Sequence, residues 1–570
     1  MQRASRVLIL LTLGASVCAG VRGGAASARI DVSRPGGRLS SGELREALAD
    51  VSKRPRHAVS DRPDLARVEV FHRVDAARAR RIVESVGGTV TGEVPGSLVQ
   101  AEVRWEDLDR LERAAGVSNV GPQRRIRVIP RSGMATDDDR TTKRRRHRNR
   151  KNKGGIGEEV QKMNAAAWHA AGHVGAGVKV GIIDLFSSRA YEKARQAGEV
   201  PAPAGTVCFN FGRPCDVFHI TPRAKHGTAV AEIVHEMAPQ AQLVLGFANT
   251  TADMQAVVDG FAAQGVRIIT RSLAAPYDGP GDGTGPIGAV VNSAIAKGMT
   301  WFNSAGNGAG TGAFPRSGSY YRGTFTDADG DGFHEFAPRT EALGIPCFAF
   351  TLGLRWDDFF EPQASVTDFD LIEVDQDLRR LDISADIQGS AGGAAPPLEN
   401  FGATACSNRR GFGLVYVLVK LVSAGSGAND VLEFQNNGLP MTVSSNPHSA
   451  AVPVCDSANS GQVCVGAIDP PLGTQIASYS SHGPTNDNRI KPDVTGAACL
   501  TSFSFARCFN GTSASTPAAA GAAALALGAG RGGTPGGLGD FVRTSVVDRG
   551  SLGPDNVYGA GELILPAPPP

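Results

Sequence analysis

The feature that most constrains the fold is a series of apolar runs separated by helical stretches. Each run is short enough to be one buried strand, and each is followed by residues with helical periodicity. Strands and helices in alternation imply an α/β fold, with a parallel sheet covered by helices on both faces. The runs are Val178–Ile183, Leu243–Phe247, Val266–Ile269 and Met299–Phe302, and the helical stretches include Ala252–Ala263 and Ile287–Ala296.

Polar residues stand where these strands end. Asp184 closes the first run, Ser272 follows the third, and Asn307 lies just past the fourth. Reactive groups of such sheets gather beyond the carboxyl ends of the strands. A carboxylate after a buried strand needs a partner, because burying it alone is costly. Taken singly, Asp184 is also typical of a strand-end cap, and Asn307 of a turn.

His226 begins a predicted amphipathic helix. Apolar residues recur behind it at helical spacing, namely Val230, Ile233, Val234 and Met237. This position leaves the imidazole ring free to face a cleft. A histidine bonded to the backbone at a helix N-terminus is the structural alternative.

Ser513 precedes the small-residue run Ala518–Leu527, and Pro517 fits near the start of a helix there. Free N–H groups and the helix dipole favour developing negative charge at this end. A helix N-cap explains a serine here equally well. A buried aspartate can hold an imidazole in one tautomer, and that imidazole can take a proton from a serine hydroxyl.

Four motifs, in the order Asp, His, Asn, Ser, resemble those of the subtilisin-like serine proteases, or subtilases. The resemblance covers roughly residues 160–312 and 445–562. The serine motif of that family reads Gly-Thr-Ser-x-Ala-x-Pro. The motifs here are the strand ending in Asp184, His226-Gly227-Thr228, Ser304-Ala305-Gly306-Asn307, and Asn510–Pro517.

The resemblance implies a serine endopeptidase and a role for each matching residue. Ser513 would be the nucleophile, His226 the general base and then acid, and Asp184 the orienting carboxylate. Asn307 would donate to the oxyanion through its side-chain amide. Protein or peptide substrates would add a strand to exposed backbone edges. These edges are Ser272, Leu273 and Ala274, and Ser304, Ala305 and Gly306.

The chain departs from the family pattern at three places. Leu185 and Phe186 follow Asp184, where the family usually has Ser or Thr and then Gly. Ala274 replaces a frequent glycine, which narrows the substrate groove. Ser515 stands in the usual alanine place. No reacting group is removed by these departures.

The N-terminus reads as a secretory signal over residues 1–28. Arg3 and Arg6 precede the apolar run Val7–Val17, which is too short to span a bilayer permanently. A lipidated Cys18 is the alternative, and Val17 is a poor residue before it. We therefore expect an extracellular or periplasmic protein, with no membrane association after signal removal.

Residues 29–130 are expected to form a small α+β unit that resembles the inhibitory propeptide of subtilases. The chain's own propeptide would then be an inhibitor and folding aid. A basic linker follows over residues 131–158, and its charge block Thr141–Lys153 stays solvated. It suits a protease-accessible hinge, a plain linker or an anchor for an anionic surface. Predicted elements of the unit are strands Val68–His72, Leu98–Val103 and Ile126–Ile129, and helices Ala76–Val86 and Leu108–Ala115.

The catalytic domain is expected in two parts, residues 159–312 and 445–565, separated by an inserted antiparallel β-sandwich over residues 313–444. A secreted, catalytically weak scaffold whose insert binds a partner is the alternative function. Another α/β serine hydrolase would carry a Gly-x-Ser-x-Gly turn, which is absent at Ser513. Predicted strands of the insert are Phe348–Trp356, Asp368–Val374, Leu381–Ile387 and Gly413–Val422.

The proposed chemistry requires no cofactor, but one acidic loop suits a structural calcium ion. Asp327, Asp329 and Asp331 alternate around Gly330, as oxygen ligands of Ca²⁺ do. Pro338 stands where an EF-hand has its glutamate, so a plain acidic turn is the alternative. The formal net charge of +2 gives no support for a nucleic-acid partner, since the positive charge is concentrated in the linker.

Nine cysteines are present, and removal of a signal containing Cys18 leaves an even number. In an exported chain this favours disulfides. Sequence alone leaves the connectivity open. Neighbours in the sequence would pair as Cys208 with Cys215, Cys455 with Cys464 and Cys499 with Cys508, which leaves Cys347 for Cys406.

Overall fold

The computed structural model describes residues 58–59, 64–123, 157–347, 349–392, 395–402, 404, 413–425, 429–445 and 453–570. The predicted signal and nearly all of the basic linker lie outside these residues, and so does the expected strand Ile126–Ile129. None of the described helices combines the length and apolarity needed to cross a bilayer.

The largest sheet confirms the parallel architecture expected from the apolar runs. Its strand order is β22-β23-β21-β20-β11-β10-β6-β9-β7-β8, and only the outer pairs at each end are antiparallel. The strands are β6 Lys179–Ile183, β7 Gly205–Asn210, β8 Arg213–Pro214, β9 Gln242–Ala248, β10 Ile268–Arg271, β11 Thr300–Ser304, β20 Gln462–Ile468, β21 Val494–Ala497, β22 Val546–Val547 and β23 Glu562–Leu563.

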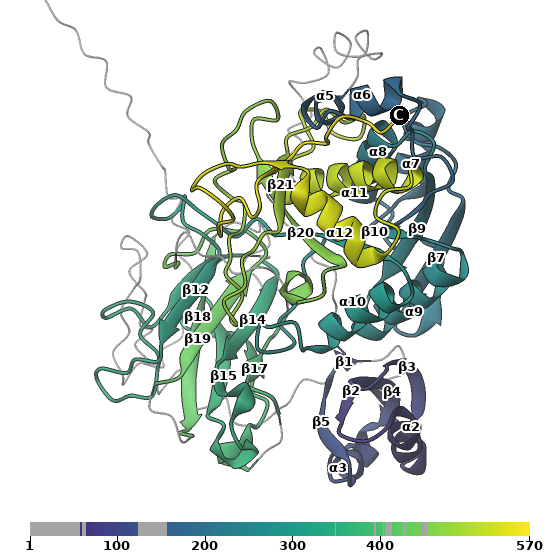
Figure 1. The fold of residues 1–570 in the computed structure, drawn as a ribbon. Helices are drawn as coiled ribbons and strands as arrows, with labels where there is room; N and C mark the ends of the chain where they lie inside the picture. The colour runs from purple at the N-terminus through teal and green to yellow at the C-terminus, as the bar shows by residue number, and fades with distance from the viewer. Residues whose placement is uncertain are drawn as a thin grey trace, which may run out of the picture.

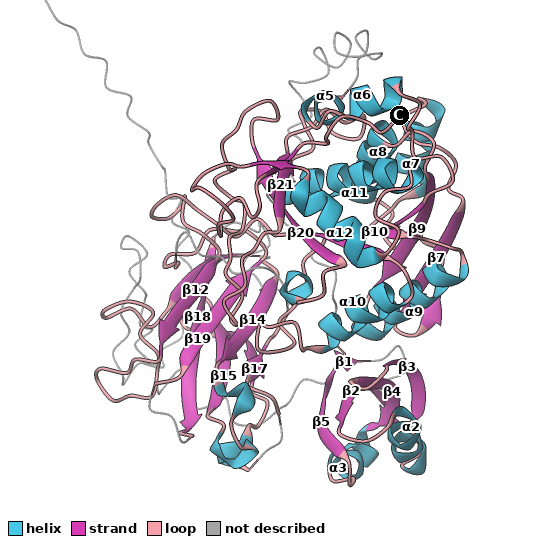
Figure 2. Cartoon of the chain, viewed as in Figure 1, coloured by secondary structure: helices cyan, strands magenta, loops and turns pink. Residues whose placement is uncertain are grey.

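Helices cover both faces of this sheet (Figure 2). Ile182 packs in a core with α8 and α11, whereas its neighbour Ile183 packs with α9 and α10. Burial on both faces explains why the strands are continuous apolar runs and not alternating ones. The helices are α5 Glu158–Lys162, α6 Ala165–Ala170, α7 Ser188–Gln196, α8 His226–Met237, α9 Thr251–Ala263, α10 Pro286–Ala296, α11 Thr512–Gly528 and α12 Pro535–Thr544.

The N-terminal α+β unit packs beneath α9 and α10 (Figure 1). At this contact the Thr250 hydroxyl donates to the side-chain oxygen of Gln100 at 2.9 Å. Within the described residues, β5 is the last strand of the unit, upstream of the one expected. The elements are β1 Ala58–Val59, β2 Leu65–His72, α2 Ala76–Ser85, β3 Thr89–Val94, β4 Leu98–Arg104, the 3₁₀ turn η1 Trp105–Asp107, α3 Leu108–Glu112 and β5 Val117–Pro122.

The insert is an antiparallel β-sandwich, as expected. One sheet has the order β12-β19-β14-β17 and the other β13-β18-β15-β16. Phe434 from the first sheet and Phe369 from the second share its core. The strands are β12 Tyr320–Thr324, β13 Leu343–Pro346, β14 Thr351–Trp356, β15 Asp368–Val374, β16 Arg380–Ser384, β17 Leu398–Glu399, β18 Leu414–Ser423 and β19 Val431–Asn436, and the short 3₁₀ turns are η4 Asp358–Phe360, η5 Gln363–Ser365 and η6 Gly389–Ala391. The 3₁₀ turn η7 Pro453–Asp456 follows the insert.

Three of the four expected disulfides are present, Cys208–Cys215, Cys455–Cys464 and Cys499–Cys508. Cys347 is also disulfide-bonded, and its expected partner Cys406 lies outside the described residues.

The buried carboxyl group of Glu159 meets the half-buried one of Glu236 where α5 packs on the end of α8. Burial, and then the charge of Glu159, raises the pKa of Glu236 to about 10. Because this pKa is raised on folding, protonated Glu236 contributes to the free energy of unfolding. The contribution is fully present below about pH 4.5 and is lost as the pH rises toward 10. The free energy of unfolding falls by at most about 1.4 kcal/mol per pH unit over this range.

Replacing Glu236 with glutamine removes this pH dependence, since an amide mimics the protonated acid. We expect the melting temperature of Glu236→Gln to exceed that of the wild type by more at pH 8 than at pH 5. Thermal unfolding at both pH values measures this difference. If the two proteins differed in melting temperature by the same amount at both pH values, Glu236 would not be protonated in the folded protein at neutral pH.

Candidate active site

Asp184 and His226 form a buried hydrogen-bonded pair at one edge of the sheet. Asp184 follows β6, and His226 is the first residue of α8. The Nδ1 atom of His226 lies 2.7 Å from Oδ1 of Asp184, and both side chains are almost fully buried. This contact fixes the ring orientation and leaves Nε2 as the outward nitrogen.

The unusual Leu185-Phe186 pair anchors α8. The backbone N–H of Leu185 donates to Oδ1 of Asp184 at 2.7 Å, and its carbonyl accepts the N–H of Gly227 at 3.0 Å. The Phe186 ring is fully buried and packs edge-on against Phe218. The departure from the family pattern therefore fills a core position and ties the Asp184 loop to the histidine helix.

Ser513 lies in the first turn of α11, as the sequence predicted. Its hydroxyl donates to the backbone carbonyl of Ser272 at 3.2 Å, and the hydroxyl of Ser272 donates to the Ser513 carbonyl at 3.1 Å. The Ser513 hydroxyl is thus hydrogen-bonded to the Ser272 carbonyl and not to the His226 ring.

Two packed helices bring the imidazole and the hydroxyl to the same edge. Both residues are in the first turn of their helices, and α8 packs directly against α11. Phe509, four residues before Ser513, contacts the His226 ring edge-on with centroids 5.2 Å apart.

Asn307 is held by the turn that precedes Ser513. Its side-chain oxygen accepts the backbone N–H of Thr512 at 3.0 Å and the Thr512 hydroxyl at 3.1 Å. These donors orient the amide, so that its NH₂ group remains to donate elsewhere. Gly511 has φ +91°, and a methyl group added there would lie 3.0 Å from the Asn307 nitrogen. This close approach explains the glycine in the serine motif.

The two expected substrate-binding segments leave the sheet side by side. β10 and β11 are parallel neighbours, with Arg271 opposite Asn303. Ser272, Leu273 and Ala274 therefore lie beside Ser304, Ala305 and Gly306, at the edge that carries Ser513.

Arg271 is a site residue that the sequence analysis missed. Its guanidinium donates to the carbonyl oxygens of Leu273 at 2.6 Å and Ala274 at 3.2 Å. Burial lowers the pKa of Arg271 to about 10, against the opposing effect of the Asp184 charge. The available signal was a charged residue ending an apolar strand. Arg271 fixes the backbone of the first substrate-binding segment.

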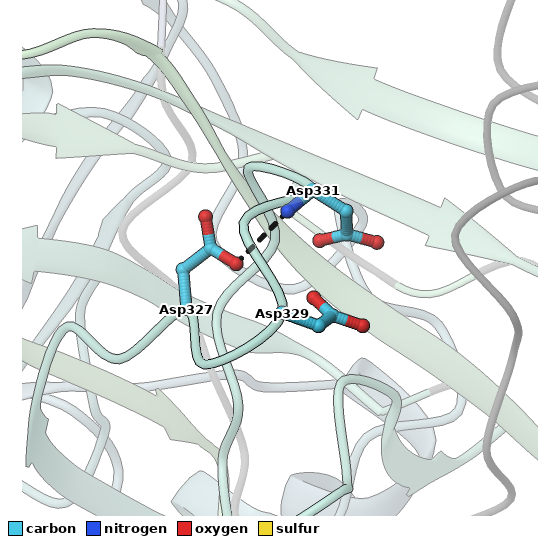
Figure 3. A group of neighbouring side chains, drawn as sticks. All are labelled: Asp327, Asp329 and Asp331. Atoms are coloured by element: carbon cyan, nitrogen blue, oxygen red, sulfur yellow. Dashed lines mark hydrogen bonds between the residues drawn. The ribbon is translucent and has the colours of Figure 1, made fainter.

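Asp327, Asp329 and Asp331 gather in one loop of the insert (Figure 3), with carboxylate oxygens within 4.8 Å of one another. Asp327 accepts the backbone N–H groups of Gly330, Asp331 and Gly332. The oxygen-rich set fits Ca²⁺, but the hydrogen bonds also suit a plain acidic turn, so the calcium site stays a prediction.

Calcium is expected to stabilise the protein through this loop. With 5 mM Ca²⁺ in place of a chelator, the melting temperature should rise, since about tenfold excess over a weak Kd is worth about 1.4 kcal/mol. Differential scanning calorimetry measures the shift, and Asp329→Ala should abolish it. If the melting temperature were the same with calcium and with chelator, the loop would be a plain acidic turn and not a calcium site.

Comparisons with known proteins found a matching family model and similar solved structures. The model described as "Subtilase family" matches residues 395–561, a segment that contains Ser513. One similar solved structure is the epidermin leader peptide processing serine protease of Staphylococcus aureus, at 13% identity, 88% coverage of this chain, 97% of that chain and TM-score 0.46. A mutant of the same protein is 12% identical to this chain, and the match covers 88% of this chain and 97% of that chain with a TM-score of 0.46. Both likenesses are too distant to support a conclusion about this chain.

The segment that contains Ser513 thus matches a family of subtilisin-like serine proteases. The matched segment covers less than a third of the chain, and the match agrees with the resemblance seen in the motifs around Ser513.

Proposed function

We propose that the chain is a secreted serine endopeptidase in which Asp184, His226 and Ser513 act as a catalytic triad. The observation that carries the proposal is the buried 2.7 Å contact between His226 Nδ1 and Asp184, beside the helix that begins at the serine motif. An imidazole held in this way presents Nε2 as a base.

The reaction begins when the Ser513 hydroxyl leaves the Ser272 carbonyl and turns toward His226. Its oxygen attacks the carbonyl carbon of the peptide bond as the proton passes to Nε2. Asp184 stabilises the resulting imidazolium, which then protonates the departing amine. The acyl group remains on Ser513 until water, activated by the same imidazole, releases it.

Asn307 and the N-terminus of α11 would stabilise the oxyanion. Replacing Asn307 with alanine should lower kcat about 10²- to 10³-fold, because the amide donates most strongly to the charged transition state. This magnitude was measured for subtilisin itself and is borrowed here. KM should change little, and steady-state kinetics on a peptide substrate separates the two constants. A change in KM alone would assign Asn307 to substrate binding.

Residues 29–130 would act as an inhibitor and folding aid, released by cleavage in or near the basic linker. The contact of this unit with α9 and α10 supports the role. N-terminal sequencing of the protein recovered from the culture medium tests export and processing together. A first residue between 131 and 158 is expected, and an intact N-terminal unit would contradict the role.

Casein hydrolysis by the folded, processed protein tests the enzymatic function. Hydrolysis that a fluorophosphonate inhibits is expected. A folded protein without hydrolysis would favour the alternative, a scaffold whose insert binds a partner.

A further inference from the structure

Glu232 carries a fully buried carboxyl group that the proposed triad does not use. It lies on α8, the helix that begins at His226, and is 1% exposed. A carboxylate in such a place is costly unless hydrogen bonds replace the water it has lost. The donors that meet Glu232 therefore show which part of the chain it holds.

These donors belong to one loop, residues 499–509, which we call the clamp loop. Oε2 of Glu232 accepts the Ser502 hydroxyl at 2.6 Å and the backbone N–H of Phe503 at 2.8 Å. Oε1 accepts the Ser504 hydroxyl at 2.6 Å. Burial raises the pKa of Glu232, whereas these donors favour its ionised form. Glu232 thus fastens the middle of the clamp loop to α8.

The clamp loop is closed at its base and leads directly into the serine motif. The Cys499–Cys508 disulfide joins its two ends. The backbones of Leu500 and Phe509 also exchange two hydrogen bonds, each of 2.8 Å. Because the ends are cross-linked, hydrogen bonds to the middle of the loop also restrain Phe509 and the approach of the chain to Ser513.

Two aromatic rings carry this restraint to the imidazole. Phe505, directly after Ser504, stacks on Phe509 with ring centroids 5.2 Å apart. Phe509 is fully buried and contacts the His226 ring edge-on, a geometry that aromatic rings favour. The Asp184 contact holds Nδ1, and the Phe509 ring restricts rotation of the imidazole about that contact.

We propose that Glu232 is a positioning residue, which sets the approach of His226 to Ser513 by holding the clamp loop against α8. The inference rests on the proposed roles of His226 and Ser513. The Ser513 hydroxyl is hydrogen-bonded to the Ser272 carbonyl and has to turn toward Nε2 before it can give up its proton. The imidazole must keep its place during that turn, since a misplacement of about 1 Å can lower a rate about 100-fold.

The test replaces Glu232 with glutamine, which keeps the size of the side chain but turns one acceptor into a donor facing the loop. Glu232→Gln should lower kcat on a peptide p-nitroanilide about 10- to 100-fold, with KM nearly unchanged, because proton transfer is impaired and substrate binding is not. Fluorophosphonate labelling of Ser513 should slow by a similar factor. Glu236→Gln is the matched control, the same acid-to-amide change on the same helix but at the α5 contact, and it should leave kcat unchanged.

A double-mutant cycle with Phe509→Ala separates positioning from general destabilisation. If Glu232 acts through the clamp loop, each single variant loses kcat and the double variant loses little more than Phe509→Ala alone. Losses that multiply in the double variant, an unchanged kcat in Glu232→Gln, or an equal loss in Glu236→Gln would overturn the positioning role.

A milder variant carries the test if Glu232→Gln does not fold. Ser502→Ala combined with Ser504→Ala removes two hydroxyl donors and leaves the carboxylate in place. It should lower kcat with KM nearly unchanged, and an unchanged kcat would overturn the proposal. In each of these outcomes hydrolysis by the wild type upholds the triad, whereas a folded wild type that cleaves neither the p-nitroanilide nor casein would overturn both proposals.

Discussion

Ser513→Ala is expected to lower kcat about 10⁶-fold, the loss known for the catalytic serine of subtilisin and borrowed from it. The substitution removes the attacking oxygen. Substrate binding should persist, because the backbone segments at Ser272 and Ser304 are untouched. Hydrolysis of a peptide p-nitroanilide by processed protein measures the loss, with circular dichroism as the check on folding.

Ser515→Ala is the matched control on the same helix. Ser515 is fully buried, and the structure gives its hydroxyl no hydrogen-bond partner among the described residues. Its removal should leave kcat unchanged. If Ser513→Ala kept more than about one hundredth of the wild-type rate, a different nucleophile would be required.

Asp184→Asn is expected to lower kcat about 10⁴-fold, as the equivalent change does in chymotrypsin-like enzymes. The amide can donate to Nδ1 of His226, which places the imidazole proton on Nε2. That tautomer cannot accept the serine proton. The same kinetic assay measures the effect, with little change in stability expected.

An exposed Asp–His pair supplies the control for this substitution. Asp216 contacts His219 at 2.8 Å, the same chemical pairing as Asp184 with His226, but both side chains are more than half exposed. Asp216→Asn should leave kcat unchanged. If Asp184→Asn and Asp216→Asn changed kcat equally, the buried pair would have no catalytic role of its own.

The sequence predicted the parallel sheet well because buried strands are continuous apolar runs. β10 and β11 lie within two residues of their expected starts. Weaker patterns failed: β3 is mostly half-exposed and carries a glycine, and β17 is two residues long. Such strands form because they pair with neighbouring strands, and pairing with a strand far away in the sequence produces no pattern in the local residues.

The site was predictable where its residues belong to motifs, and not where tertiary contacts define them. Asp184 and His226 were identified from a strand end and a helix start. Arg271 was missed because its partners are backbone carbonyls, which carry no side-chain pattern.

The most direct test of the triad is to map the site of a fluorophosphonate adduct on the processed wild type by peptide mass spectrometry. The catalytic account predicts a single adduct on Ser513, formed far more slowly in His226→Ala. An adduct on another residue, an undiminished rate in His226→Ala, or no adduct on protein shown to be folded would contradict it.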